Sequence, residues 1–366
     1  MLALTICILL PFSTAARQMK VEPSIVGSWM GAIEAGGAKM RLVFEIAATD
    51  NGELTGTVGS PDKGIKGINL SRVHVNGDSV VFAIASAYAG FEGKFIDAKT
   101  AITGNWKEGG IVFPLTLNRI TDTTGIKGAY DFAKQSAVPL SLQKTSRHFD
   151  FYSCDGDSNA LDDIAKTLED NTNRITDHLK IRFTERIRVY IYPDVKTFHT
   201  AIYWPDAPDW AIGAAGINEM KMVSPLNPGS AHTYASLMQA IVHELVHSAV
   251  INAVGLEGLS RLPKWLNEGY AFYEAGQMTD DMRESVKSHV QEKAPPTWNQ
   301  LNPKDIVEFG NMGGYQLSTT IIEFLVKKHG FKKLMKLIEA PDELETIYGR
   351  SMDVLEKQWV QYIKNM

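Results

Sequence analysis

The sequence predicts a two-domain protein, with an N-terminal all-β small antiparallel barrel and a C-terminal α+β domain that is mostly helical. Apolar and polar residues alternate with a period of two in the N-terminal part. Beyond about residue 160, apolar residues recur at helical spacing instead. The 366 residues, 44% hydrophobic and 22% charged, are enough to build two separate cores.

Residues 24–120 are predicted to form the barrel. Its alternation is clearest in two runs, Met40, Leu42, Phe44 and Ile46, and later Ile111, Phe113, Leu115 and Leu117. Hairpin-type turns at Asp50-Asn51-Gly52, Asn76-Gly77-Asp78 and Gly109-Gly110 separate the runs. We expect six to eight strands. A small barrel either holds an apolar or other ligand or is filled by its own side chains, and the sequence does not choose between the two.

Residues 1–16 are predicted to be a signal peptide, because the apolar run Met1 to Phe12 is followed by the small residues from Ser13 to Ala16. The protein is therefore expected to be exported, either to the periplasm or to the medium. Without this segment Cys154 is the single cysteine, which excludes an internal disulfide.

Charge and hydropathy exclude two classes of partner. The net charge is -5 and no long run of Lys or Arg occurs, so we expect no nucleic-acid partner. No apolar stretch after the signal reaches the roughly 20 residues of a membrane helix, so we expect no stable membrane span.

Residues 121–146, which contain Pro139 and lack periodicity, are predicted to be a linker to the domain at 147–366. In that domain Leu161, Ile164 and Leu168 predict a helix, and the run from Arg186 to Tyr192 predicts a strand.

The run His243-Glu244-Leu245-Val246-His247 lies in an apolar, helix-forming stretch from about Thr233 to Ile251. Side chains four residues apart project from one face of a helix, so both imidazoles can chelate one metal ion. Glu244 lies beside the first histidine, where its carboxylate can act as a general base on water. Burying the two imidazoles and the carboxylate among apolar neighbours would cost several kcal/mol unless a metal or other partners compensate.

A third metal ligand is predicted at Glu268. Catalytic zinc typically takes three protein ligands. Pro263 is suited to open a helix, Glu268 projects from that helix, and Gly269 allows another backbone to approach closely.

The two motifs, His243 to His247 and Trp265-Leu266-Asn267-Glu268-Gly269, resemble the gluzincin metallopeptidases, and residues from about 147 to 339 resemble the bacterial peptidase MA-like domain family. The resemblance implies one Zn²⁺ ion held by His243, His247 and Glu268, with Glu244 as general base. It also implies that Tyr315 stabilises the oxyanion. Residues 27–118 resemble a lipocalin-like β-domain found ahead of hydrolase domains.

The sequence departs from thermolysin-like members at Phe272, where they carry an aspartate that orients a histidine ligand. Asn267 and Glu274 are the candidates for such hydrogen bonds here. The segment Trp210 to Gly216, with Ile212, Gly213 and Ala214 at its centre, is either a glycine-rich loop or the edge strand that binds an extended substrate.

The predicted function is zinc-dependent hydrolysis of a peptide or protein substrate. The alternative is an exported ligand-binding protein in which the zinc site is structural or inactive. The intact Glu244 favours the enzyme, because a structural site needs a fourth protein ligand and no base.

Overall fold

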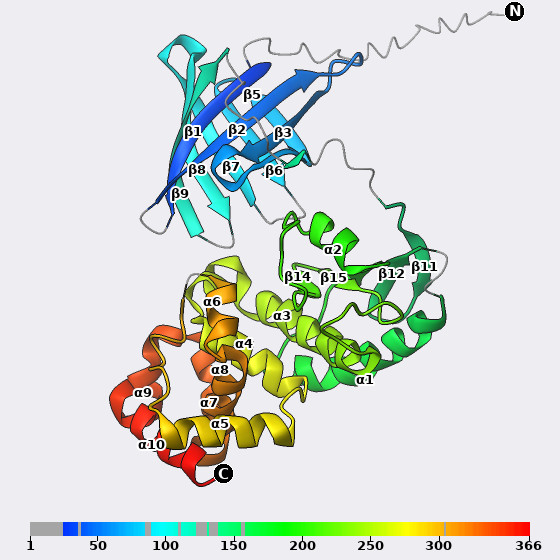
Figure 1. Cartoon of the computed structure of the whole chain (residues 1–366). Helices are drawn as coiled ribbons and strands as arrows, with labels where there is room; N and C mark the ends of the chain where they lie inside the picture. The colour runs from blue at the N-terminus through cyan, green and yellow to red at the C-terminus, as the bar shows by residue number, and fades with distance from the viewer. Residues whose placement is uncertain are drawn as a thin grey trace, which may run out of the picture.

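The computed structural model describes residues 25–35, 38–84, 89–108, 111–121, 130–131, 138–154, 158–303 and 305–366. The predicted signal peptide, residues 1–16, lies outside this set. The described residues form two parts, an N-terminal β-part and a mostly helical C-terminal part, and each part contains one sheet (Figure 1). The predicted fold class is confirmed.

The β-part is built on a sheet of ten strands in the order β10-β4-β3-β2-β1-β9-β8-β7-β6-β5. Its strands are Gly27–Ala35 (β1), Ala38–Ala48 (β2), Leu54–Ser60 (β3), Ile65–Asn69 (β4), Arg72–Asn76 (β5), Ser79–Ile84 (β6), Ala89–Ile96 (β7), Ala101–Glu108 (β8), Ile111–Ile120 (β9) and Tyr130–Asp131 (β10). Nine of these strands lie within residues 24–120, where six to eight were expected. The alternating runs are interrupted more often than the turn residues in the sequence indicate.

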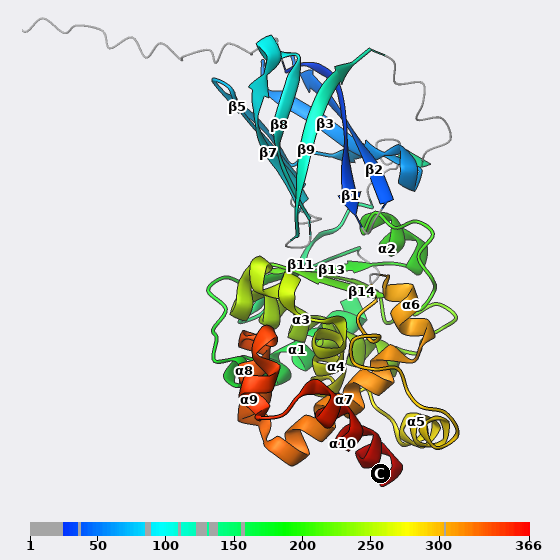
Figure 2. The same cartoon turned by 90° about the vertical axis from the view of Figure 1, so that its left-hand side faces the viewer.

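This sheet is a curled half-barrel that is antiparallel throughout except where the two-residue β10 pairs parallel with β4. Strands β4 and β5 are separated by two residues in the chain, Leu70 and Ser71, yet they stand near opposite ends of the hydrogen-bonded order. The sheet must therefore curl to bring its two ends together, as Figure 2 shows. Aromatic rings occupy the interior: Phe44 is fully buried and packs against Phe82, Phe91 and Trp106.

The helical part contains a second sheet in the order β11-β12-β13-β15-β14. Its strands are Ser141–Thr145 (β11), Phe149–Ser153 (β12), Ile187–Tyr192 (β13), Gly213–Gly216 (β14) and Glu219–Val223 (β15). Strands β12, β13 and β15 are parallel, whereas β14 pairs antiparallel with β15 and forms an edge. The stretch expected to be a linker thus contains β10 and β11. Both strands are too short for their period to stand out in the sequence.

Ten α-helices complete the described part of the chain: Ser158–Leu179 (α1), Val195–Ala201 (α2), Tyr234–Arg261 (α3), Lys264–Glu274 (α4), Asp280–Glu292 (α5), Ile306–Asn311 (α6), Gly314–His329 (α7), Phe331–Glu339 (α8), Leu344–Tyr348 (α9) and Met352–Lys364 (α10). The short α2 covers one face of the second sheet and α1 and α3 cover the other (Figures 1 and 2). The helical and strand predictions around Leu161 and Ile187 are confirmed by α1 and β13.

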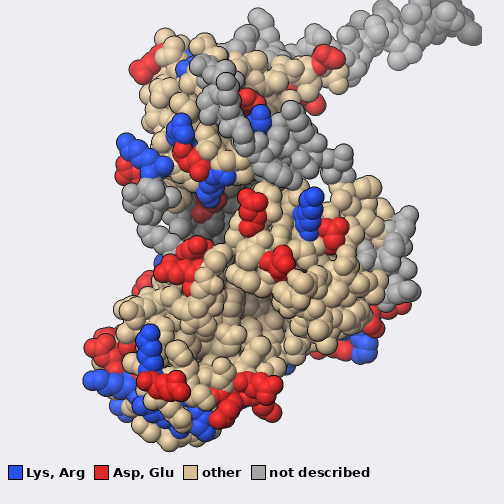
Figure 3. Space-filling view, viewed as in Figure 1, with Lys and Arg blue, Asp and Glu red and all other residues tan. Residues whose placement is uncertain are grey.

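Helix α3 is the centre of the helical part. Its segment Tyr234–Gly255 is long and apolar enough, by length and composition alone, to cross a membrane, although no such stretch was expected after the signal. Ile241, Leu245, Val246 and Ala249 of this segment are fully buried in the core shared with α1, α4 and α7. The apolar composition of α3 is therefore explained by burial inside the protein. Charges of both signs gather at the end of this part that contains α9 and α10, while the centre of the same face is mostly uncharged (Figure 3).

Candidate active site

The two motif histidines project from one side of α3. Thr233 caps the helix by accepting from the backbone N–H of Ser236, and the helix then runs unbroken until Gly255, whose φ is 70°. Within this regular segment, Nε2 of His243 and Nε2 of His247 are 2.9 Å apart. The predicted convergence of the two imidazoles is present.

Glu268 joins this pair from α4. The helix begins directly after Pro263, and Oε2 of Glu268 lies 3.3 Å from Nε2 of His243 and 3.4 Å from Nε2 of His247. A Cβ at Gly269 would lie 2.8 Å from backbone atoms of Ser318 on α7. The absent side chain therefore lets α7 pack closely against α4 at the residue after Glu268.

Hydrogen bonds orient both rings. Nδ1 of His247 lies 3.3 Å from Oδ1 of Asn267, and Nδ1 of His243 lies 2.8 Å from Oε1 of Gln277. An amide oxygen accepts, so Nδ1 of each ring carries a proton and donates, and Nε2 of each ring is the atom that would bind a metal after losing its own proton. Asn267 was a sequence candidate. Gln277 was not, because nothing in the sequence marks a glutamine that follows a helix end.

Glu274, the other candidate for this role, points elsewhere. Its carboxylate pairs with Arg174 and His178 of α1. Glu274 lies six positions after Glu268 in α4, and both of its carboxylate oxygens are engaged by α1 instead of the cluster. The assignment of Glu274 to a ring of the cluster is wrong.

The cluster has the dimensions of a tetrahedral zinc site. Ligand atoms 2.0 to 2.2 Å from one zinc ion at tetrahedral angles are about 3.3 to 3.6 Å apart. The two distances to Glu268, 3.3 and 3.4 Å, match this range, and the distance between the imidazoles, 2.9 Å, is slightly shorter. One nitrogen or oxygen atom from each residue lies within 4.8 Å of the others. The donor set of two imidazoles and one carboxylate therefore fits zinc.

The three groups strongly influence one another's charge. Burial raises the pKa of Glu268, but the charge of His247 and the hydrogen bonds of both histidines outweigh it, so the pKa lies well below its usual range. Burial lowers the pKa of His247, and the nearby Glu268 reverses this effect and raises it. The cluster thus holds an ionised carboxylate, which favours a cation.

Glu244 lies between the cluster and the edge strand β14. A Cβ at Gly213 would be 2.5 Å from Oε1 of Glu244, so this glycine leaves the space that the carboxylate occupies. Burial raises the pKa of Glu244, while His247 and His243 oppose the shift. A carboxylate with a raised pKa is suited to accept and return a proton near neutral pH. The edge strand predicted around Gly213 is present, although Ile212 lies one residue before it.

Tyr315, near the start of α7, lies beside the cluster. Its ring centroid is 6.4 Å from that of His243, 6.1 Å from Phe272 and 6.3 Å from Trp210. Burial raises the pKa of its hydroxyl, and the charges of Glu268 and Glu244 add to this effect. The hydroxyl therefore remains protonated at neutral pH and is available as a hydrogen-bond donor.

A pair of histidines one turn apart, a carboxylate from the following helix and a second carboxylate beside them is the arrangement of a metallopeptidase. The chain belongs to the peptidase MA superfamily, whose family model matches residues 167–365. A search of curated proteins gave no match. Among solved structures, the chain is similar to a two-domain M1 zinc metallopeptidase mutant bound to L-arginine, with 11% identity and a TM-score of 0.31. That similarity covers 81% of this chain and 59% of the other.

Proposed function

We propose that the protein hydrolyses peptide bonds of a peptide or protein substrate with one zinc ion held by His243, His247 and Glu268. The observation that carries this proposal is the triangle of three largely enclosed ligand atoms, spaced close to the geometry of a zinc site. Membership of a peptidase superfamily supports it. Only three candidate ligands gather among the described residues, which leaves room for the water that a catalytic site needs.

The chemistry divides between the ion and the chain. Zinc, when bound, polarises the scissile carbonyl and lowers the pKa of a water ligand to about 7. Glu244 takes the proton from the attacking water and returns it to the leaving amine. Tyr315 donates a hydrogen bond to the developing oxyanion. Strand β14 adds the extended substrate to the sheet through its unpaired edge, which places the scissile bond alongside Glu244.

The alternative, an exported ligand-binding protein with a structural or inactive zinc site, is disfavoured by Glu244. A structural zinc site is closed by four protein ligands and needs no general base. A buried carboxylate with a raised pKa next to the ligands, such as Glu244, is expected of a catalytic site. We propose that the β-part is an accessory module. We also propose export, on the strength of residues 1–16.

The test is Glu244→Gln, which keeps the shape of the side chain and removes the base. We expect the variant to bind one zinc ion as the wild type does and to lose about 10² to 10⁴-fold in kcat on a mixed peptide library. His243→Ala and Glu268→Ala should lose the metal itself. Glu257→Gln, an exposed glutamate on the same helix, is the control and should behave as the wild type. A Glu244→Gln protein of normal activity contradicts the proposed base. Zinc binding without any hydrolysis in the wild type favours the alternative.

A further inference from the structure

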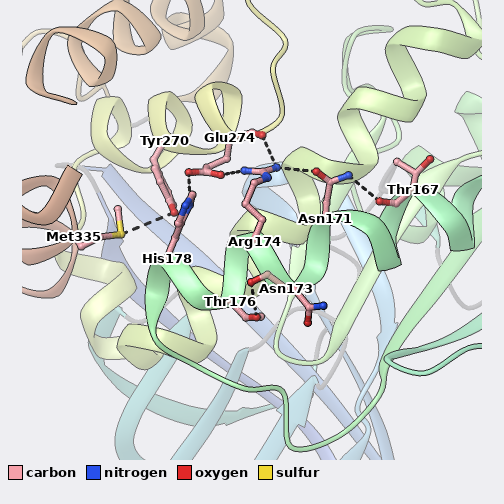
Figure 4. A network of polar contacts seen from close by, with 9 residues as sticks. All are labelled: Thr167, Asn171, Asn173, Arg174, Thr176, His178, Tyr270, Glu274 and Met335. Carbon is pink, nitrogen blue, oxygen red and sulfur yellow. Dashed lines mark hydrogen bonds and ion pairs between the residues drawn. The ribbon is translucent and has the colours of Figure 1, made fainter. Parts of the chain in front are cut away.

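A buried carboxylate at the end of α4 is held by two side chains of α1. The side chain of Glu274 is only 1% exposed, and it pairs with Arg174 through one oxygen and with His178 through the other (Figure 4). Removing a carboxylate from water costs several kcal/mol unless it is paired. Arg174 and His178 are four residues apart and therefore lie on one face of α1. The contact joins the two helices at one point.

Arg174 also binds the backbone at this point. Its Nη2 donates to the carbonyl oxygen of Glu274 at 3.0 Å and to Oδ1 of Asn171 at 2.7 Å. Asn171 in turn donates to the carbonyl oxygen of Thr167 at 2.9 Å (Figure 4). The last carbonyls of a helix have no partner within the helix, and the guanidinium supplies one. Arg174 thus fixes both the side chain and the backbone of Glu274.

A tight turn connects this fixed point to the candidate metal centre. Gly276 has a φ of 64° and its N–H donates to the carbonyl of Tyr273, while the N–H of Gln277 donates to the carbonyl of Phe272. These two bonds close the turn that commonly ends a helix at glycine. Gln277 then places its Oε1 2.8 Å from Nδ1 of His243. Only two residues separate Glu274 from Gln277, so a shift of the C-terminal end of α4 would also move the side-chain amide of Gln277.

We propose that Arg174 and Glu274 are positioning residues, which fix the end of α4 so that Gln277 holds His243 in the orientation that binds metal. The proposal rests on the proposed function of the histidine cluster. Glu274 is not a member of that cluster, so the effect passes through the turn and Gln277.

The chain offers a matched control in Arg283 and Glu323. This ion pair joins α5 to α7 with two contacts of 2.6 Å, and its side chains are 34% and 7% exposed. The corresponding values for Arg174 and Glu274 are 40% and 1%. The two pairs are thus similarly buried, but only the first includes a residue of α4, the helix whose end leads into the turn that carries Gln277.

The first measurement is the zinc dissociation constant of Arg174→Met and Arg283→Met, determined by competition with a chelator. Loss of a group that orients a ligand typically weakens metal binding 10- to 100-fold, so we expect about 10-fold for Arg174→Met. Arg283→Met should stay within about 2-fold of the wild type, although both variants lose thermal stability. Equal dissociation constants for the two variants overturn the proposal.

The second measurement asks whether the effect passes through Gln277. Gln277→Ala alone should weaken zinc binding by about 10-fold or more. Adding Arg174→Met to it should change little, because residues that act through one contact are not additive. If the two effects multiply, Arg174 does not act through Gln277.

The third measurement does not depend on zinc. Nitrogen-15 spectra of the histidines in the metal-free protein report which ring nitrogen of His243 carries the proton. The wild type should show it on Nδ1, and Arg174→Met should show a mixture. Identical spectra overturn the positioning role even if the protein binds no zinc. Failure to bind zinc with altered spectra overturns the proposed function alone.

Discussion

At the scale of single residues, the space beside Glu244 depends on one missing side chain. We expect Gly213→Ala to push the carboxylate from its place, because the new methyl would lie 2.5 Å from Oε1 of Glu244. A displaced base should reduce kcat/KM by about 10-fold or more while zinc stoichiometry stays at the wild-type value. Peptide hydrolysis and metal content measured on the same sample test this.

Gly310→Ala on α6 is the control for this substitution. The nearest atom to a Cβ there belongs to Trp210, at 3.5 Å, which is an ordinary contact. Its rate should stay close to that of the wild type. An equal loss of activity in both variants would show that the space beside Glu244 is not the cause.

Of the two residues that orient the imidazoles, one could be proposed from the sequence and the other could not. Asn267 could be proposed because it adjoins Glu268 in the motif, but adjacent side chains of a helix point about 100° apart, so its contact with His247 depends on packing. Gln277 lies 34 residues after His243, beyond the end of α4, and only the packing of α3 against that turn brings the two together. Glu274 was assigned wrongly, because it shares a face of α4 with Asn267 but its carboxylate pairs with Arg174 and His178 of α1.

At the scale of elements, Glu169 fastens the turn between β11 and β12 to α1. Its carboxylate accepts from the Ser146 hydroxyl at 2.6 Å and from the His148 N–H at 2.8 Å. Burial raises the pKa of Glu169, but these bonds and the His148 ring outweigh it and lower the pKa. A lowered pKa in the folded state stabilises the protein above the unfolded pKa, and this contribution disappears as the pH falls through the folded value.

We therefore expect Glu169→Gln to lower the free energy of unfolding at pH 7 by about 1 to 3 kcal/mol. The difference from the wild type should shrink as the pH falls below about 4, where the carboxyl of the unfolded chain takes up a proton first, and vanish once the pH has fallen through the lower pKa of the folded state. Chemical denaturation at several pH values measures it. If the difference in unfolding free energy between wild type and Glu169→Gln does not change with pH, the substitution acts through altered packing and not through the loss of the negative charge.

At the scale of the whole molecule, the two parts have separate cores. The aromatic core of the β-part contains none of the metal-binding cluster, while α3 and α4 contribute to the core of the helical part. Zinc should therefore stabilise one part only. At a free concentration 100 times the dissociation constant, the gain is about 2.7 kcal/mol.

Calorimetry of the full chain, with zinc and after chelation, measures this gain. We expect the transition of the helical part to move to higher temperature with zinc and that of the β-part to stay in place. A single transition that moves as a whole would show that the contact of Tyr203 with the β-part core couples the two parts. A transition that does not move at all contradicts the proposed metal site.

The sequence by itself determined what depends on spacing along one element. Period two predicts the strands, and four-residue spacing places His243 and His247 together. The tertiary structure alone decided what depends on the packing of separate elements: how the first sheet curls, that Gln277 meets His243, and that Arg174 reaches Glu274 across 100 residues of chain. Local geometry repeats along a helix or strand and can be read from a pattern. Contacts between distant segments depend on how whole faces pack, and no pattern in one segment specifies them.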